Sequence, residues 1–429
     1  MMWNCVETSP HKNGKAYFVG TKYKSDDFTP YIYKTEDYGN IWTKITNGIP
    51  SNHFARCIRA DKRRPGLLYC GTEYGMYISY DDGANWKPFQ QNLPIVPVTD
   101  LTIKENDLIV ATQGRAFWVL DDLTMVQERE PAAQMNIDVF SVNAAYRYDG
   151  FQNTNAKNAG MNPLNGAVIN YRVKELTDST KLSIDILDKN KKLIKTFSTD
   201  AKEKEDKVEL NKGFNQFVWN MNYPPAEKID GLILWHGAVP GPKAAPGQYF
   251  YKIKTGKDSS SGSFVIKANP VYNIPQQDYE AQFDFLITLR DKFSDIQKAI
   301  KNIRDIRKQL NDFVDKQGKD CPKDIKQQAD TINKQMTVIE DALHQTKAKS
   351  GQDVLNFPIR LDDKISGLYD FASSGNNAPA KQVIDAYAEL SGQANVQLDK
   401  LKKIMEEDLL KFNQLIREKA LPVIGIKKE

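Results

Sequence analysis

The sequence predicts a multidomain protein in which β structure comes first and α-helix last. Three observations indicate this order: a repeated β-rich unit before residue 130, short strand-like runs from 140 to 270, and helical spacing of apolar residues from 275 onward. The chain has 429 residues, of which 40% are hydrophobic and 27% are charged, a balance typical of globular proteins. We therefore expect domains at 1–130, 140–270 and 275–429.

The first region contains an internal repeat. Residues 35–42 and 79–86 both read Ser/Thr-x-Asp-x-Gly-x-x-Trp, and their aspartates stand 44 residues apart. A strand-like run precedes each copy, and a third β-rich unit without the motif follows at 98–121. A β unit that repeats at this period has the size of one four-stranded propeller blade. The region therefore predicts a partial β-propeller of about three blades.

The repeated motif, an Asp box, is interpreted as a structural turn. Its Asp carboxylate can accept backbone N–H groups of the turn, its Gly permits positive φ, and its Trp begins the outer strand. A ligand-binding role is the less favoured alternative. The residues given this structural role are Thr35, Asp37, Gly39, Trp42, Ser79, Asp81, Gly83 and Trp86.

The second region stays β-rich but loses the repeat. Turn-like sequences at 188–191 and 245–249 separate short apolar or alternating runs, which is typical of a two-sheet sandwich. We expect an immunoglobulin-like β-sandwich with strands at 167–173, 181–187, 193–197, 214–221, 248–254 and 263–266.

The third region has helical periodicity. Apolar residues step by three and four positions through 286–310, 324–343 and 381–417, and a shorter helix is expected at 362–372. Long amphipathic helices joined by short loops predict an antiparallel helical bundle. The seam expected in the third long helix includes Leu401, Met405, Leu409 and Phe412.

Charge and composition argue against several classes of protein. A net charge of +4 from 59 basic and 55 acidic residues gives no electrostatic basis for nucleic-acid binding. No apolar run in the sequence is long enough for a membrane span. The four cysteines lack metal-ligand spacing, so we expect neither a metal nor a cofactor. Two buried free thiols at Cys57 and Cys70 are favoured over a disulfide between them.

Together with the two Asp boxes, residues 114–123 (Gly-Arg-Ala-Phe-Trp-Val-Leu-Asp-Asp-Leu) resemble the end of the Asp-box (BNR) propellers of sortilin-like proteins. Residues 213–220 resemble the β-sandwich of that family, and 285–292 and 303–310 resemble its helical tail. The resemblance implies an extracellular or periplasmic protein, and bacterial members are often labelled glycosyl hydrolases. In that family a histidine usually precedes the glycine, whereas this chain has Gln113. Any function of an imidazole at that position is therefore not expected here.

Five residues are candidates for contacting a ligand, and several have a structural alternative. Arg115 could instead form a salt bridge at the blade edge, Asp121 could belong to a turn or cap, and Trp235 could cover the sandwich core. No two carboxylates stand out as the pair that a glycosidase needs. The candidates are Arg115, Trp118, Asp121, Trp235 and His236.

The sequence as a whole favours a non-catalytic binding or scaffold protein that recognises a peptide, protein or glycan. The alternative is a glycoside hydrolase whose catalytic carboxylates lie on blades missing from this chain. Three blades do not close a ring, because propellers have about four to eight. With a strand already at residues 2–7, we expect a truncated reading frame, a fragment, or a ring completed by blades of another chain.

Overall fold

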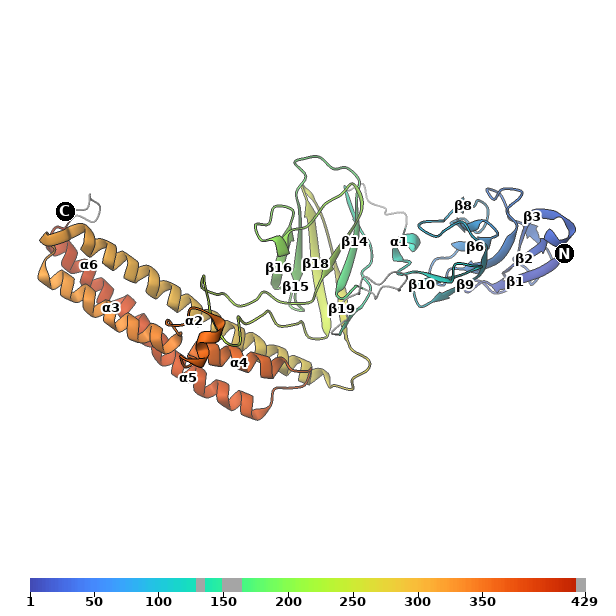
Figure 1. Ribbon diagram of the computed structural model, residues 1–429. Helices are drawn as coiled ribbons and strands as arrows, with labels where there is room; N and C mark the ends of the chain where they lie inside the picture. Colours follow the sequence, from blue (N-terminus) through green and yellow to red (C-terminus); the bar gives the residue numbers. More distant parts are fainter. Residues whose placement is uncertain (129–135, 149–163, 422–429) are drawn as a thin grey trace. The chain divides into compact units, whose positions relative to one another are not determined.

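The computed structural model describes residues 1–128, 136–148 and 164–421. Several antiparallel sheets come first and a helical region follows, which confirms the order of β and α structure expected from the sequence (Figure 1). The chain forms two compact units, Met1–Ser141 and Val142–Glu429. The boundary expected near residue 130 lies outside the described residues, and the division into three domains stays a prediction.

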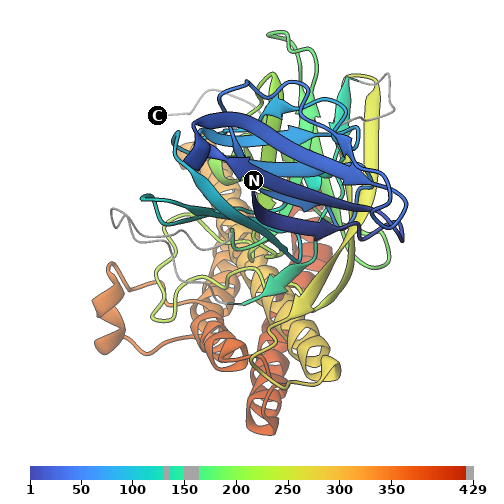
Figure 2. The ribbon, with the colours of Figure 1, turned by 90° about the vertical axis from the view of Figure 1, so that its right-hand side faces the viewer.

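The first unit contains three antiparallel sheets in sequence order (Figure 2). The first sheet consists of β1 (Met2–Thr8), β2 (Ala16–Lys22), β3 (Asp27–Thr35) and β4 (Thr43–Lys44). The second consists of β5 (Ala55–Ala60), β6 (Leu68–Thr72), β7 (Gly75–Ser79) and β8 (Lys87–Pro88). The third consists of β9 (Val98–Lys104), β10 (Asp107–Thr112) and β11 (Phe117–Leu120). The short helix α1 (Thr124–Gln127) and strand β12 (Ile137–Val139) follow.

These three sheets stack face to face, with a separate apolar core in each interface. Val19 and Ile32 of the first sheet share a core with Ile58 of the second, and all three are fully buried. Tyr69 of the second sheet and Leu101 of the third lie in the other core. Because successive residues of a strand point to opposite faces, the second sheet contributes side chains to both cores.

The second unit begins with two further groups of strands. β14 (Ala167–Val173) pairs antiparallel with β17 (Gly213–Trp219). Trp219 is fully buried and contacts Tyr249 and Phe264 of the neighbouring sheet, so the two groups pack face to face. That sheet has five strands in the order β13 (Ala145–Arg147), β19 (Asp258–Ala268), β18 (Gly247–Thr255), β15 (Leu182–Leu187) and β16 (Leu193–Ser198).

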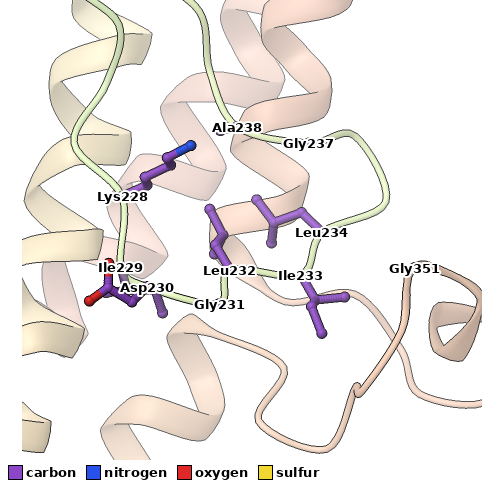
Figure 3. Close-up of a pocket in the computed structure, with 10 residues that line it drawn as sticks. All are labelled: Lys228, Ile229, Asp230, Gly231, Leu232, Ile233, Leu234, Gly237, Ala238 and Gly351. Carbon is purple, nitrogen blue, oxygen red and sulfur yellow. The ribbon is translucent and has the colours of Figure 1, made fainter. Parts of the chain in front are cut away.

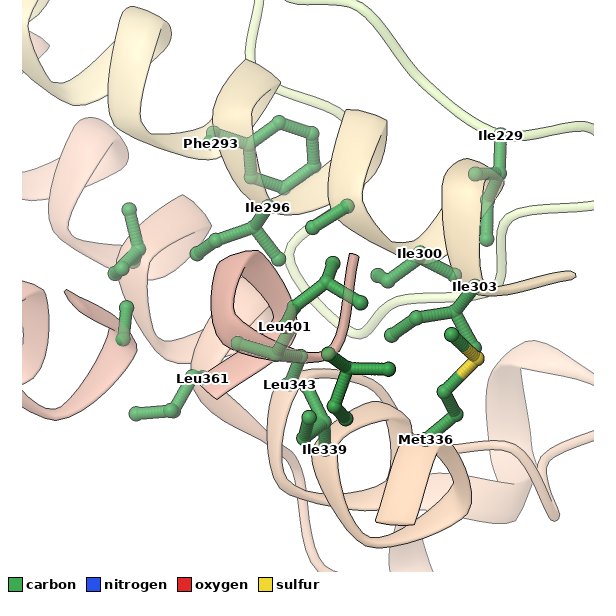
Figure 4. Packing of buried hydrophobic residues seen from close by; sticks show 14 of the residues in the cluster. Ile229, Phe293, Ile296, Ile300, Ile303, Met336, Ile339, Leu343, Leu361 and Leu401 are labelled. Carbon is green, nitrogen blue, oxygen red and sulfur yellow. The ribbon is translucent and has the colours of Figure 1, made fainter. Parts of the chain in front are cut away.

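The helical region packs around one extended apolar core (Figure 4). Phe293 of the first long helix, Ile339 of the second and Leu401 of the third all lie in it. Apolar spacing on one face of each helix produces this core, as the sequence pattern predicts. The helices are α2 (Gln276–Gln317), α3 (Lys323–Leu343), α4 (Leu361–Ser373), α5 (Lys381–Lys403) and α6 (Leu409–Glu418).

The third long helix differs from the expected uninterrupted one. A π-turn at Ile404–Asp408 separates α5 from α6. The wider turn takes up an extra residue and shifts the phase of the apolar face. Ile404 is therefore buried, whereas Met405, which the expected seam includes, is exposed to solvent.

Candidate functional site

The first Asp box forms a hydrogen-bonded turn between β3 and β4. The Asp37 carboxylate accepts the Thr35 hydroxyl at 2.8 Å and the Ile41 N–H at 2.9 Å. The Thr35 hydroxyl in turn accepts the Gly39 N–H at 3.0 Å. The hydrogen bonds from the Ile41 N–H and the Thr35 hydroxyl stabilise the ionised carboxylate and lower the pKa of Asp37.

The second Asp box repeats this geometry between β7 and β8. Asp81 accepts the Ser79 hydroxyl at 2.8 Å and the Asn85 N–H at 2.8 Å. The Ser79 hydroxyl accepts the Gly83 N–H at 2.9 Å. Desolvation opposes ionisation of Asp81, but the hydrogen bonds from Asn85 and Ser79 outweigh it and lower the pKa. Both Asp carboxylates are therefore engaged within their own turns.

The tryptophans of the two boxes have different surroundings. Trp86 is only 3% exposed, lies in the core between the first and second sheets, and donates its Nε1–H to the Ile45 carbonyl at 2.8 Å. Trp42 is 38% exposed and contacts Phe18 edge to face, with ring centroids 4.6 Å apart. The same motif residue is thus a core residue in one sheet and a surface residue in the other.

Alanine at the box glycines is expected to affect the two copies differently. Gly39 and Gly83 have φ of 90° and 85°, so any side chain is strained there. A Cβ on Gly83 would lie 2.4 Å from Ile45 Cδ1, whereas one on Gly39 would lie 3.7 Å from Trp42. We expect Gly39→Ala to lower the unfolding free energy by about 1 kcal/mol and Gly83→Ala by about 2–4 kcal/mol, because overpacking adds to backbone strain. Urea unfolding measures this, and equal losses would contradict it.

Aromatic side chains gather at the end of the sheets opposite to the Asp boxes. Because β2–β3 and β6–β7 are antiparallel pairs, their connecting loops lie at the other end from the turns that follow β3 and β7. We call this surface the aromatic loop face, and it comprises Tyr23, Phe28, His53, Phe54, Arg56, Glu73 and Tyr74.

Ring stacking organises the aromatic loop face. Tyr74 stacks on His53 with ring centroids 4.5 Å apart, and Tyr23 stacks on Phe54 at 5.2 Å. His53 Nδ1 also lies 2.8 Å from the Tyr77 hydroxyl. Partial burial lowers the pKa of His53, so its imidazole is neutral at physiological pH. A neutral ring suits stacking against an uncharged ligand surface.

A charged pair lies beside the stacked rings. The Arg56 Nε–H donates to Glu73 Oε2 at 2.6 Å, and the Arg56 guanidinium lies 5.2 Å from the centroid of the Phe54 ring. Phe28 and Tyr74 are both exposed to solvent. The face thus presents flat π surfaces next to polar groups, an arrangement suited to a sugar ring or to the side chains of a peptide.

The sequence reading missed this face, although the sequence contains a signal for it. Residues 20–23 and 71–74 both read Gly-Thr-x-Tyr. In the structure, these segments end β2 and β6 and place Tyr23 and Tyr74 in the loops that follow. A second repeat, independent of the Asp box, therefore marks the opposite end of the sheets.

Arg115, Trp118 and Asp121, the candidate ligand-contacting residues of the third sheet, do not lie together at one end of that sheet. Arg115 lies in the β10–β11 loop, on the same end as the aromatic loop face, and its carbonyl accepts the Trp118 Nε1–H at 2.9 Å. Its guanidinium donates to the Gly114 carbonyl at 2.9 Å, and Arg115 makes no ion pair with another described residue. Asp121 lies at the other end, where desolvation and the charges of Asp107 and Asp122 raise the pKa of its carboxyl.

Trp235 and His236 belong to a loop of the second unit. Their backbone N–H groups donate to the Asp363 carboxylate of α4 at 2.8 and 3.1 Å. The Trp235 side chain is 53% exposed. The preceding residues 228–234 line a pocket together with Gly351 (Figure 3). Hydrogen bonding of the main chain to α4 gives this loop a structural role.

The cysteines and the metal-ligating side chains point to no further site. All four cysteines are free, and Cys57 and Cys70 are buried, as favoured from the sequence for these two. Burial raises the pKa of the Cys57 and Cys70 thiols, so both stay protonated. Across the described ranges, no group of three or more His, Cys, Asp or Glu side chains could hold a metal ion. No helix in the same ranges is long and apolar enough to cross a bilayer.

Comparison with known proteins gives only partial likenesses: no family model matches the chain, and no curated protein does. An ancestral GH74 enzyme is similar over 27% of this chain and 14% of its own, with 17% identity and a TM-score of 0.22. YCF48 bound to D1 peptide is similar over 28% of this chain and 36% of its own, with 20% identity and a TM-score of 0.21. The GH74 xyloglucanase from Xanthomonas campestris is similar over 40% of this chain and 29% of its own, with 11% identity and a TM-score of 0.22. The chain spans 14% to 36% of these structures, and likenesses at these TM-scores carry no inference about its function.

Proposed function

We propose that the chain is a non-catalytic binding or scaffold protein that recognises a peptide, protein or glycan outside the cytoplasm. In this proposal the three stacked sheets are blades of an Asp-box propeller, the next two sheets form an immunoglobulin-like sandwich, and the helices form a bundle. The aromatic loop face binds the ligand, and the Asp boxes serve only as structural turns. The location rests on the resemblance of the sequence to Asp-box proteins.

The stacked aromatic rings at one end of the sheets are the observation on which this proposal depends. Tyr74 over His53 and Tyr23 over Phe54 present rings from the first and second sheets on one surface. Exposed aromatic rings offer a large apolar area that a sugar ring or an apolar side chain can cover. Arg115 adds a guanidinium from the third sheet, which can donate hydrogen bonds to a ligand oxygen.

The carboxylates near this face support binding rather than hydrolysis. Glu73 is paired with Arg56, and Asp27 accepts the Tyr31 hydroxyl at 2.6 Å, which lowers the pKa of Asp27. A glycosidase needs one carboxyl with a raised pKa to act as general acid. Asp121, the carboxyl of the third sheet with a raised pKa, lies at the opposite end.

Ligand screening with two tyrosine variants tests the proposal. A glycan array and a peptide library are probed with the full chain, with Tyr74→Ala, and with Tyr38→Ala, which removes an exposed tyrosine from the Asp-box end. We expect Tyr74→Ala to weaken binding at least about tenfold, equivalent to about 1.4 kcal/mol, and Tyr38→Ala to leave it unchanged. The absence of any ligand, or binding lost only in Tyr38→Ala, would contradict the proposal.

A glycan found in this screen also decides between binding and hydrolysis. The full chain is incubated with the glycan, and new reducing ends are measured. We expect the glycan to remain intact. Cleavage would favour the alternative function, a glycoside hydrolase.

A further inference from the structure

The three sheets of the first unit share one register, including the same β-bulge. In each sheet the first strand carries one extra residue opposite the second: Asn4 in β1, Arg56 in β5 and Thr99 in β9. The shared bulge fixes which positions of the three sheets are equivalent. We call one matched face the receiving face; it comprises Trp3, Val6, Phe18 and Tyr33 in the first sheet, Ala55, Ile58, Cys70 and Tyr77 in the second, and Val98, Leu101, Val110 and Trp118 in the third.

The receiving face of the second and third sheets is packed against the preceding sheet. In the second sheet all four members lie in the core shared with the first sheet. In the third sheet three members are buried in the core shared with the second sheet, and Trp118 packs against that core. The same face therefore accepts a preceding sheet twice within one chain.

In the first sheet the equivalent positions carry an exposed aromatic cluster. The Phe18 ring contacts Trp3 at 4.7 Å, Tyr33 at 4.9 Å and Trp42 at 4.6 Å between centroids. Trp3 and Val6 are each 67% exposed. A contiguous apolar surface of this kind marks an interaction site. Its position in the repeated stack indicates that the partner is another sheet.

The outward face of the third sheet supplies the complementary surface. We call it the leading face, and it contains Ile109, Phe117 and Val119 on β10 and β11. Phe117 is 76% exposed. Two members of the leading face have apolar or aromatic equivalents in the first sheet: by register, Ile109 corresponds to Tyr17 and Phe117 to Ile32. In the second sheet all three members have such equivalents, since Ile109, Phe117 and Val119 correspond to Tyr69, Met76 and Ile78. Those five equivalents are buried against the sheet that follows.

We propose that two copies of the chain associate head to tail, with the leading face of each copy on the receiving face of the other. The inference rests on the propeller of the proposed function. Each contact repeats the stacking that joins consecutive sheets within the chain. Two such contacts close a ring of six sheets, which falls within the range of about four to eight blades of known propellers.

A head-to-tail contact fits the two faces better than a symmetric contact between two receiving faces. The Lys22 and Lys44 ammonium groups lie over the Tyr31 ring, at 5.0 and 4.9 Å from its centroid. Tyr31 lies on the same side of β3 as Tyr33, so a symmetric contact whose twofold axis runs along the strands would bring these lysines of both copies together. The leading face instead offers Ile109 and Phe117, whose equivalents in the first and second sheets are buried against the sheet that follows.

Sedimentation equilibrium of the full chain and two surface variants tests this inference. We expect a mass twice the 48.7 kDa of one chain. Phe18→Glu damages the receiving face and Phe117→Glu the leading face, so each is expected to weaken the dimer at least tenfold. An equal mixture of the two variants retains one intact receiving face and one intact leading face, so it is expected to dimerise more strongly than either variant alone.

Phe371→Glu is the matched control, because Phe371 is an exposed phenylalanine on α4 of the second unit. It is expected to leave the dimer unchanged, and near-UV circular dichroism confirms that all variants are folded. A monomeric wild type, a dimer that survives Phe117→Glu, or a mixture no stronger than its components would overturn the inference. A monomer that still binds ligand through Tyr74 would leave the proposed function intact. A dimer that binds no ligand would overturn the proposed function alone.

Discussion

Trp86→Ala is expected to destabilise the first unit by about 3–5 kcal/mol. The ring is almost fully buried between the first and second sheets. Its removal leaves a cavity and deprives the Ile45 carbonyl of its 2.8 Å hydrogen bond. Hydrogen exchange of peptides within Met1–Ser141 at increasing urea concentration measures this loss separately from unfolding of the second unit.

Trp42→Ala is the matched control, because it removes the same residue from the other Asp box. In the monomer Trp42 lies at the surface and contacts Phe18, so at protein concentrations too low for dimerisation we expect a loss of about 1 kcal/mol. Equal losses in the two variants would contradict the different surroundings of the two tryptophans.

Phe293→Ala is expected to destabilise the second unit by about 3–5 kcal/mol. The side chain has no exposed surface and lies in the apolar core of the helical region (Figure 4). Phe371→Ala on α4 removes an exposed side chain of the same type, and we expect it to change stability by less than about 0.5 kcal/mol. Far-UV circular dichroism during urea unfolding measures both values. Similar losses from Phe293→Ala and Phe371→Ala would contradict the described core.

Helices and strands that bury one apolar face could be predicted from the sequence. Apolar spacing indicated the helices that contain Phe293 and Ile339, and both residues are buried in the helical core. Strand-like apolar runs indicated β9, β10 and β11 although that sheet lacks an Asp box. The positive φ of Gly39 and Gly83 followed from the turn chemistry of the motif.

Features that depend on a neighbouring element could not be predicted in the same way. Trp42 and Trp86 occupy the same motif position, and only the stacking of the second sheet on the first buries Trp86. The π-turn buries Ile404 in place of Met405. It leaves the three- and four-residue spacing of apolar residues nearly intact, so periodicity alone does not reveal it.

The aromatic loop face could be recognised only once the register of the strands was known. His53 and Tyr74 are distant in sequence, and they meet because β5 and β6 are adjacent antiparallel strands. The Gly-Thr-x-Tyr repeat was available in the sequence, but it identifies a ligand surface only once both loops are known to lie at one end of the sheets.

Hydrogen exchange with and without the ligand found by screening locates the binding surface without any substitution. We expect the ligand to slow exchange in residues 23–28, 53–56 and 73–74, which carry the aromatic loop face. Exchange in the Asp-box turns at 36–42 and 80–86 is expected to remain unchanged. Protection confined to those turns, or to the loop of Trp235, would contradict the assignment of the aromatic loop face as the binding surface.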